Sequence, residues 1–199
     1  MNPNRGLAWS VAVSALGYFV DLYDIVIFGV VRVTSLGALG LAGQQVTDWG
    51  VRLLNLQMLG MLAGGVFWGV IGDRFGRRFT LLATISLYSL ANIANAAVGT
   101  VGQYAVLRFV AGFGLAGELG AGVTLVAELL PAARRGYGTT VISFLGLVGA
   151  LTASYIGSGF GWRTAYLARG GLGLLVLIGR FWGLRESDLY TLRDRKSVV

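Results

Sequence analysis

The segment Gly69-Val-Ile-Gly-Asp-Arg-Phe-Gly-Arg-Arg78 places four charged residues between two long apolar stretches. On its two sides, residues 53–71 and 79–98 are each about long enough to cross a bilayer, which takes ~20 mostly apolar residues. Gly76 suits a tight turn, because glycine adopts backbone angles that other residues rarely adopt. The segment therefore predicts two antiparallel membrane helices joined by a short, positively charged turn.

The rest of the chain is equally apolar. Hydrophobic residues make up 55% and charged residues 13%, with a mean hydropathy of +0.72, whereas a soluble domain carries about 25% charged residues. We expect a single all-α membrane bundle over residues 1–199, with a cytoplasmic tail at 182–199 and a short surface helix within the long loop 32–52. The six expected transmembrane helices run over residues 7–31, 53–71, 79–98, 104–126, 139–156 and 164–181.

The loop charges predict the orientation. With the N-terminus inside, ten Lys and Arg residues fall in cytoplasmic segments and three in outer segments. Such a bias favours a cytoplasmic location for both termini. It also explains the net charge of +7 without nucleic acid. We expect no cleavable signal at the N-terminus, which would suit a bacterial inner membrane.

Composition also excludes several kinds of chemistry. The chain has no Cys and no His, so thiol nucleophiles, disulfides and the commonest metal ligand are absent. We expect no enzymatic activity, no metal and no cofactor.

An internal repeat supports the topology. Gly72-Asp-Arg-Phe-Gly-Arg-Arg78 matches Gly157-Ser-Gly-Phe-Gly-Trp-Arg163 at four positions, one loop being inside and the other outside. Two inverted three-helix units would produce this arrangement.

The quoted segment resembles the loop signature of the major facilitator superfamily, G-x-x-x-D-R-x-G-R-R. Arg108-Phe-Val-Ala-Gly112 resembles the R-x-x-x-G pattern of the fourth helix, and residues 128–136 are similar to the E-x-x-P-x-x-x-R-G that follows it. Leu184-Arg-Glu-Ser187 looks like the close of the sixth helix in sugar porters and metabolite–proton symporters. The resemblance implies the N-terminal six-helix half of such a transporter.

The same resemblance implies a cytoplasmic charge network that holds one gate conformation. Static anchoring of the loops is the alternative, because interfacial ion pairs often contribute little. The candidate residues of the gating network are Gly69, Asp73, Arg74, Gly76, Arg77, Arg78, Glu128 and Arg135.

Two acids lie near the middle of the first span. Asp21 and Asp24 share a helix face, and burying a charge at mid-membrane costs at least ~2.5–3.5 kcal/mol. They resemble the D-x-x-D segment of metabolite–proton symporters. Because two neighbouring carboxylates do not easily both ionise, one could exchange protons near neutral pH. A structural pair bonded to Tyr18, Tyr23 or the backbone is the alternative.

Arg108 and Glu118 are the charged residues of the fourth span. They lie ~15 Å apart along a straight helix and cannot pair directly. We expect Arg108 to pair with Asp21 or Asp24, or to contact an anionic substrate through its fork of donors. Arg169 departs from the family pattern, in which a small or apolar residue is expected at this position. It could bind substrate, pair with Glu118 or line an interface with another chain.

Small residues at helical spacing predict close helix packing. These pairs are Gly60 with Gly64, Gly65 with Gly69, and Gly112 with Ala116.

These features together predict secondary active transport of a small polar or anionic metabolite, with proton coupling. A lone half offers one wall of a cavity, so its partner would be a second copy of itself or a missing C-terminal half. A membrane sensor or scaffold module is the alternative function, and the scattered acids do not favour a channel.

Overall fold

A computed structural model describes residues 3–129 and 135–183 of the chain, with side chains for residues 16–76, 78–118 and, apart from a few positions, 136–181. The described residues form six α-helices and no strand, which confirms the all-α fold class. The helices are α1 (Pro3–Ala38), α2 (Gln44–Phe75), α3 (Arg77–Ala96), α4 (Val101–Leu129), α5 (Arg135–Gly159) and α6 (Trp162–Gly183).

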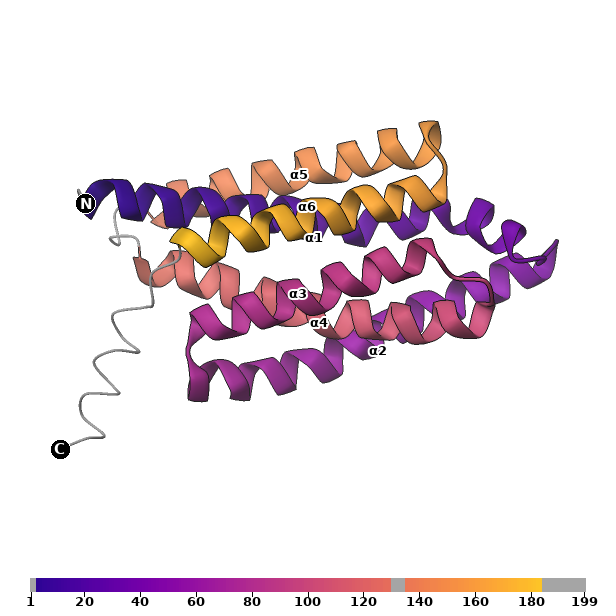
Figure 1. Cartoon of the computed structure of the whole chain (residues 1–199), viewed down its shortest axis with the longest axis horizontal. Coiled ribbons are helices and arrows are strands. Elements are labelled where there is room, and N and C mark those ends of the chain that lie inside the picture. Colours follow the sequence, from indigo (N-terminus) through magenta and orange to yellow (C-terminus); the bar gives the residue numbers. More distant parts are fainter. Residues whose placement is uncertain (1–2, 130–134, 184–199) are drawn as a thin grey trace.

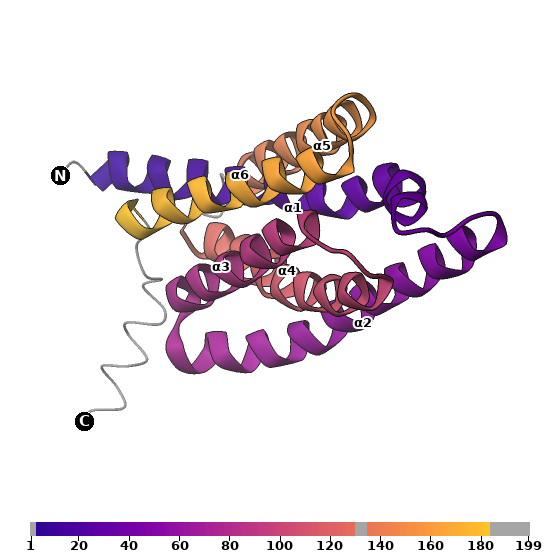
Figure 2. The ribbon, with the colours of Figure 1, turned by 45° about the vertical axis from the view of Figure 1, so that its right-hand side comes forward.

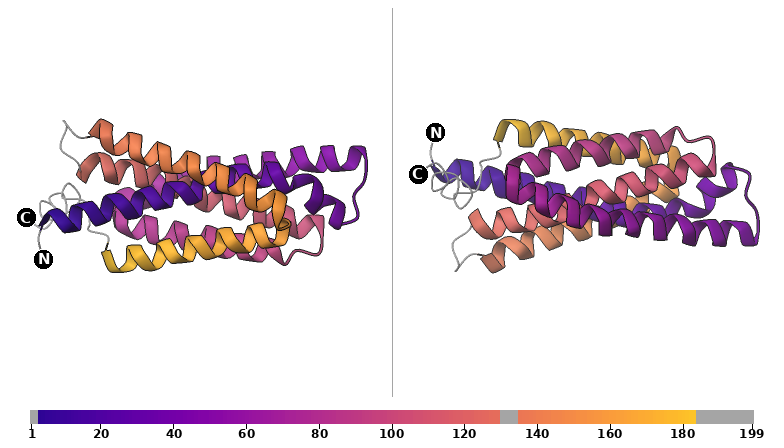
Figure 3. Two further views of the ribbon diagram at one scale, coloured as in Figure 1. Left: turned by 90° about the horizontal axis from the view of Figure 1, so that it is seen from above. Right: turned by 90° about the horizontal axis from the view of Figure 1, so that it is seen from below.

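The six helices run along one common long axis and alternate in direction (Figures 1 and 3). The start of α1 and the end of α6 lie at the same end of the bundle, on the left of Figure 1. At the opposite end, the link between α1 and α2 projects beyond the other helices. The bundle therefore has two distinct ends, here called the Gly76 end, where α2 meets α3, and the outer end, where the link between α1 and α2 projects beyond the other helices.

The helices differ from the expected spans mainly in length. α1 runs to Ala38 and α2 begins at Gln44, so the separate surface helix expected between residues 32 and 52 is wrong. Leu36 is fully buried and Leu41 packs against the same core cluster, which explains why the Leu-rich segment extends the bundle. Gly40, with a φ of 86°, allows the chain to reverse. The span expected at 79–98 ends at Ala96.

A single residue joins α2 to α3. Gly76 has a φ of 90° and donates its backbone N–H to the carbonyl of Gly72 at 3.1 Å. An L-residue with a Cβ rarely adopts this conformation, which confirms the expected role of this glycine.

The packing repeats itself within the chain. α2 packs most extensively on α4 and α1 on α5, while α3 contacts both α4 and α6. If α1, α2 and α3 are exchanged with α4, α5 and α6, respectively, the α2–α4 pair becomes the α5–α1 pair. Figures 1 and 2 show the result: α1, α5 and α6 form the upper group and α2, α3 and α4 the lower one. Two three-helix repeats account for this pattern.

Glycine permits the closest of these contacts. A Cβ at Gly60 or Gly64 would collide with the backbone of α4, and one at Gly112 would collide with the backbone of α2 at Gln57. Gly65 and Gly69 have nothing near their hypothetical Cβ atoms, so the expectation of close packing there is wrong within this chain. They lie on the outward face of α2, rotated away from α4.

The distribution of side chains is inverted relative to a soluble bundle. Leu62 and Val66 on α2 are each 69% exposed, whereas Arg108, Arg169 and Arg180 are fully buried. Among the described residues, two helices satisfy length and hydropathy limits for a membrane span, namely α2 and Arg78–Ala96 of α3. An apolar exterior around buried charges is what a lipid environment favours.

Candidate functional site

Among the side chains that the structure describes, six charged ones lie inside the bundle, each with at most 1% of its surface exposed. Three are acids and three are arginines, so their formal charges cancel when all are ionised. Buried charges in a membrane protein normally pair or face a functional cavity. These residues are Asp21 and Asp24 of α1, Arg108 and Glu118 of α4, and Arg169 and Arg180 of α6. We call them the buried charge cluster.

The middle of the cluster is an ion pair between α1 and α6. Arg169 Nε lies 2.8 Å from Asp24 Oδ1. The second carboxylate oxygen, Oδ2, accepts a hydrogen bond of 3.2 Å from Gln57 Nε2. The Arg169 guanidinium also lies over the Tyr88 ring, 4.1 Å from its centroid. Arg169, which had several interpretations from sequence, is thus the direct partner of Asp24.

Gln57 links this pair to Arg108 toward the outer end. Its amide nitrogen donates to Asp24, and its amide oxygen accepts a hydrogen bond from Arg108 Nη2. The Arg108 guanidinium lies 4.4 Å from the centroid of the Phe28 ring. The expected direct pairing of Arg108 with Asp21 or Asp24 is therefore wrong, because the Gln57 side chain from α2 lies between them.

Arg108, like Arg169 and Arg180, has guanidinium nitrogens without a hydrogen-bond partner among the described residues. Its Nε and Nη1 atoms are buried and make no hydrogen bond within the described part of the chain. Beyond it, the hydroxyls of Tyr104 and Tyr166 lie 2.5 Å apart, and that of Tyr104 lies 3.3 Å from Ser35 Oγ. These side chains close the cluster toward the outer end with buried aromatic rings.

The second ion pair, between Glu118 and Arg180, lies toward the Gly76 end. Thr84 Oγ1 lies 3.5 Å from Glu118 Oε2. Gly17 makes room for the pair, since a Cβ there would collide with the Arg180 guanidinium and lie 2.7 Å from Glu118 Oε1. Sequence reasoning missed Arg180. The signal was its distance from Arg169, since eleven residues span close to three helical turns and bring both arginines to one face of α6.

Asp21 differs from the other two acids in forming no ion pair with a described residue. It is buried, yet its Oδ1 atom has no hydrogen-bond partner among the described residues. The charged groups that act on it are Glu118, Arg169, Arg180 and Asp24. Asp21 thus belongs to neither ion pair, although the charges of both act on it.

The structure describes the motif residues at the Gly76 end only in part. Asp73 and Arg74 are exposed in the last turn of α2, and Gly76 forms the turn. Arg78 reaches α6, where its Nη2 donates to the carbonyl of Phe181 at 3.3 Å. Gly69 faces outward. The side chains of Arg77, Glu128 and Arg135 lie outside the described residues, so the expected gating network stays a prediction.

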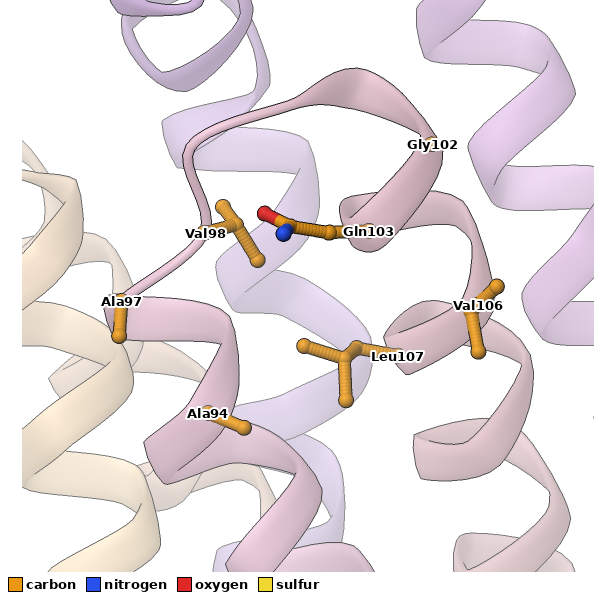
Figure 4. Close-up of a pocket in the computed structure, with 7 residues that line it drawn as sticks. All are labelled: Ala94, Ala97, Val98, Gly102, Gln103, Val106 and Leu107. Carbon is orange, nitrogen blue, oxygen red and sulfur yellow. The ribbon is translucent and has the colours of Figure 1, made fainter.

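A pocket of about 500 Å³ opens at the outer end, between the end of α3 and the start of α4. Figure 4 shows its lining: alanine, valine, leucine and glycine residues surround the single amide of Gln103. No charged side chain lines it, so it has no means of recognising an ion. The described residues likewise hold no group of three potential metal ligands.

Comparison with known proteins gives the family. The model of the Major Facilitator Superfamily matches residues 7–197. The niacin transporter NiaP of Acinetobacter baylyi is 34% identical over 82% of this chain and 37% of its own length. The benzoate transport protein of the same organism is 27% identical, over 94% and 41%. The chain thus spans less than half the length of the curated relatives it matches.

Solved structures agree on the fold. The xylose transporter XylE from E. coli, in a partially occluded inward-open conformation, superposes with a TM-score of 0.81 at 20% identity. The match covers 94% of this chain and 52% of that one. Family model, relatives and architecture coincide, and the relatives reported are transporters and not enzymes. The chain is therefore a multi-pass membrane protein with one six-helix half of the fold, and it belongs to the major facilitator superfamily.

Proposed function

We propose that this six-helix unit takes part in secondary active transport of small organic anions, with aromatic carboxylates as the first class to test. Relatives of this chain are named as transporters of niacin, benzoate and 4-hydroxybenzoate. The observation that carries the proposal is the charge-balanced cluster that the described residues form inside the bundle, in which Nε and Nη1 of Arg108 have no hydrogen-bond partner. A guanidinium suits a carboxylate because its donors match the two oxygens.

Asp21 is the proton site of this proposal. Asp24 forms an ion pair with Arg169 and accepts a hydrogen bond from Gln57, whereas Asp21 forms no ion pair with any described residue. Protonating Asp21 would leave the cluster with a net charge of +1, and binding a monoanion would return it to zero. Since uncompensated charge inside a membrane is costly, proton and anion are expected to bind together. This linkage is the physical basis of symport.

On this proposal, the substrate cavity would lie between this unit and a second one. We propose that a second copy or a separate six-helix half provides it, and that rocking of the two units gives alternating access. On the same proposal both termini are cytoplasmic, in a bacterial inner membrane. The mass of the protein in nanodiscs, corrected for lipid, separates the two assemblies: a dimer supports the homodimer, and a strict monomer contradicts it.

The coupling test is uptake of labelled benzoate or niacin into proteoliposomes, with and without an inward proton gradient. Asp21→Asn resembles the protonated acid, so this variant is expected to keep exchange between inside and outside benzoate but lose stimulation by the gradient. Asp48→Asn is the matched control, because Asp48 is an exposed acid in the first turns of α2. An Asp21→Asn variant that retains full stimulation would refute the proton role.

A further inference from the structure

A neutral amide, that of Gln57 on α2, lies among the residues of the buried charge cluster. Gln57 is 3% exposed and uses both ends of its amide, since Nε2 donates to Asp24 Oδ2 at 3.2 Å and Oε1 accepts from Arg108 Nη2. Gly112 lies one turn after Arg108 on the same face of α4. A Cβ at Gly112 would collide with the Gln57 backbone carbonyl and lie 3.1 Å from Gln57 Cγ. The close contact between α2 and α4 thus holds Gln57 beside Arg108.

The two partners of the Gln57 amide favour a single orientation. An ionised carboxylate only accepts hydrogen bonds, and a guanidinium only donates them. Turning the amide over would place its NH2 group against Arg108 and its oxygen against Asp24, so two hydrogen bonds would become two repulsive contacts. Gln57 therefore links the acid of α1 to the arginine of α4 while both are charged.

Arg108 differs from the other two buried arginines in lacking an acid as its direct partner. Arg169 and Arg180 each form an ion pair with an acid of the cluster, whereas Arg108 forms none with a described residue. Arg108 instead contacts the Phe28 ring, with 4.4 Å between the guanidinium carbon and the ring centroid, and the neutral oxygen of Gln57. Because an uncompensated charge inside a membrane is costly, this arrangement favours the binding of an anion at Arg108.

We propose that Gln57 is a positioning residue that keeps Arg108 available to the substrate carboxylate. Its side chain lies between Arg108 and Asp24 and hydrogen-bonds to both, so the two do not pair directly. Asp24 then stays with Arg169, and Arg108 keeps its charge for a ligand. This role rests on the proposed function, in which Arg108 binds the carboxylate. It adds that selection of anions over neutral molecules depends on an uncharged, hydrogen-bonding residue at position 57.

Gln57→Glu tests this role because it places a carboxylate where the neutral amide oxygen accepts from Arg108. The variant carries its own anion, which competes with the substrate for the guanidinium. We expect the affinity for benzoate to fall roughly tenfold to a hundredfold, the factor that a hydrogen bond to a charged group provides. The affinity for benzamide, an uncharged molecule of almost the same shape, should not change. A purely structural role for Gln57 would weaken the binding of both molecules alike.

The assay is equilibrium binding of radiolabelled benzoate and radiolabelled benzamide to the purified chain in nanodiscs at neutral pH. Gln45→Glu is the matched control, because Gln45 is an exposed amide of the same helix, ~18 Å from Gln57 along its axis. This control should keep the wild-type preference for benzoate.

Gln57→Met is the second variant if Gln57→Glu does not fold, as judged by circular dichroism. Methionine is similar in length but forms neither hydrogen bond, so Arg108 can turn to Asp24, and the affinity for benzoate alone should again fall. A preference for benzoate that survives these changes, or an equal loss of both ligands, would overturn the role of Gln57 and leave the proposed function standing. A wild-type chain without any preference for benzoate would instead contradict the proposed function, and the role of Gln57 with it.

Discussion

Replacing Gly64 by alanine tests how closely α2 and α4 approach each other. A Cβ at Gly64 would lie 2.8 Å from the Cα and carbonyl carbon of Phe113 and closer still to its oxygen. Carbon atoms prefer separations of about 3.5–4.0 Å. The added methyl group must therefore push the two helices apart by roughly 1 Å, because both colliding partners are backbone.

The neighbouring residue provides the matched control. Gly65 is in the same helix and has no atom within 4 Å of its hypothetical Cβ. Both substitutions gain the same helix propensity, up to ~1 kcal/mol, so this contribution cancels in the comparison. The difference between the two variants then reports the cost of overpacking, about 1–3 kcal/mol. We expect Gly65→Ala to be as stable as the wild type or slightly more stable. Gly64→Ala should be less stable than Gly65→Ala by about 1–3 kcal/mol.

The assay is unfolding by SDS in mixed micelles, followed by circular dichroism at 222 nm. The two variants are measured beside the wild type at equal detergent composition. If Gly64→Ala unfolds at the same SDS fraction as Gly65→Ala, the close contact between α2 and α4 is refuted.

Two further predictions concern the buried charge cluster. Gly17→Ala is expected to lower stability by about 1–3 kcal/mol, because its methyl group would displace the Arg180 guanidinium from Glu118. Gly29→Ala, on an open face of the same helix, should not lower stability. Equal effects of the two variants in the same SDS titration would contradict the placement of that ion pair. Asp24→Asn should cost about 3–5 kcal/mol by leaving Arg169 buried without its counterion. The double variant Asp24→Asn/Arg169→Gln should recover much of this loss, and a double variant as unstable as the sum of the single ones would show that the two residues act separately.

Much of the candidate site could be predicted from residue type alone. Asp21, Asp24, Arg108 and Glu118 stood out because a charge inside an apolar span is costly wherever the helix lies. Their pairing could not be predicted in the same way, since it depends on helix rotation and on which neighbour intervenes. Gln57 decided the outcome for Arg108, because an amide offers both a donor and an acceptor.

The sequence by itself determined the all-α membrane class, the six helices and the family, because these follow from local composition and spacing. Runs of apolar residues must form helices in lipid wherever they occur, and the Gly76 turn needs only its own backbone. Only the tertiary structure decided which glycines make contact and which charges pair. Gly64 and Gly65 are neighbours in the chain, yet one faces α4 and the other faces outward. Arg180 became the partner of Glu118 through the packing of α6 inside the bundle, which depends on the positions of all the helices at once.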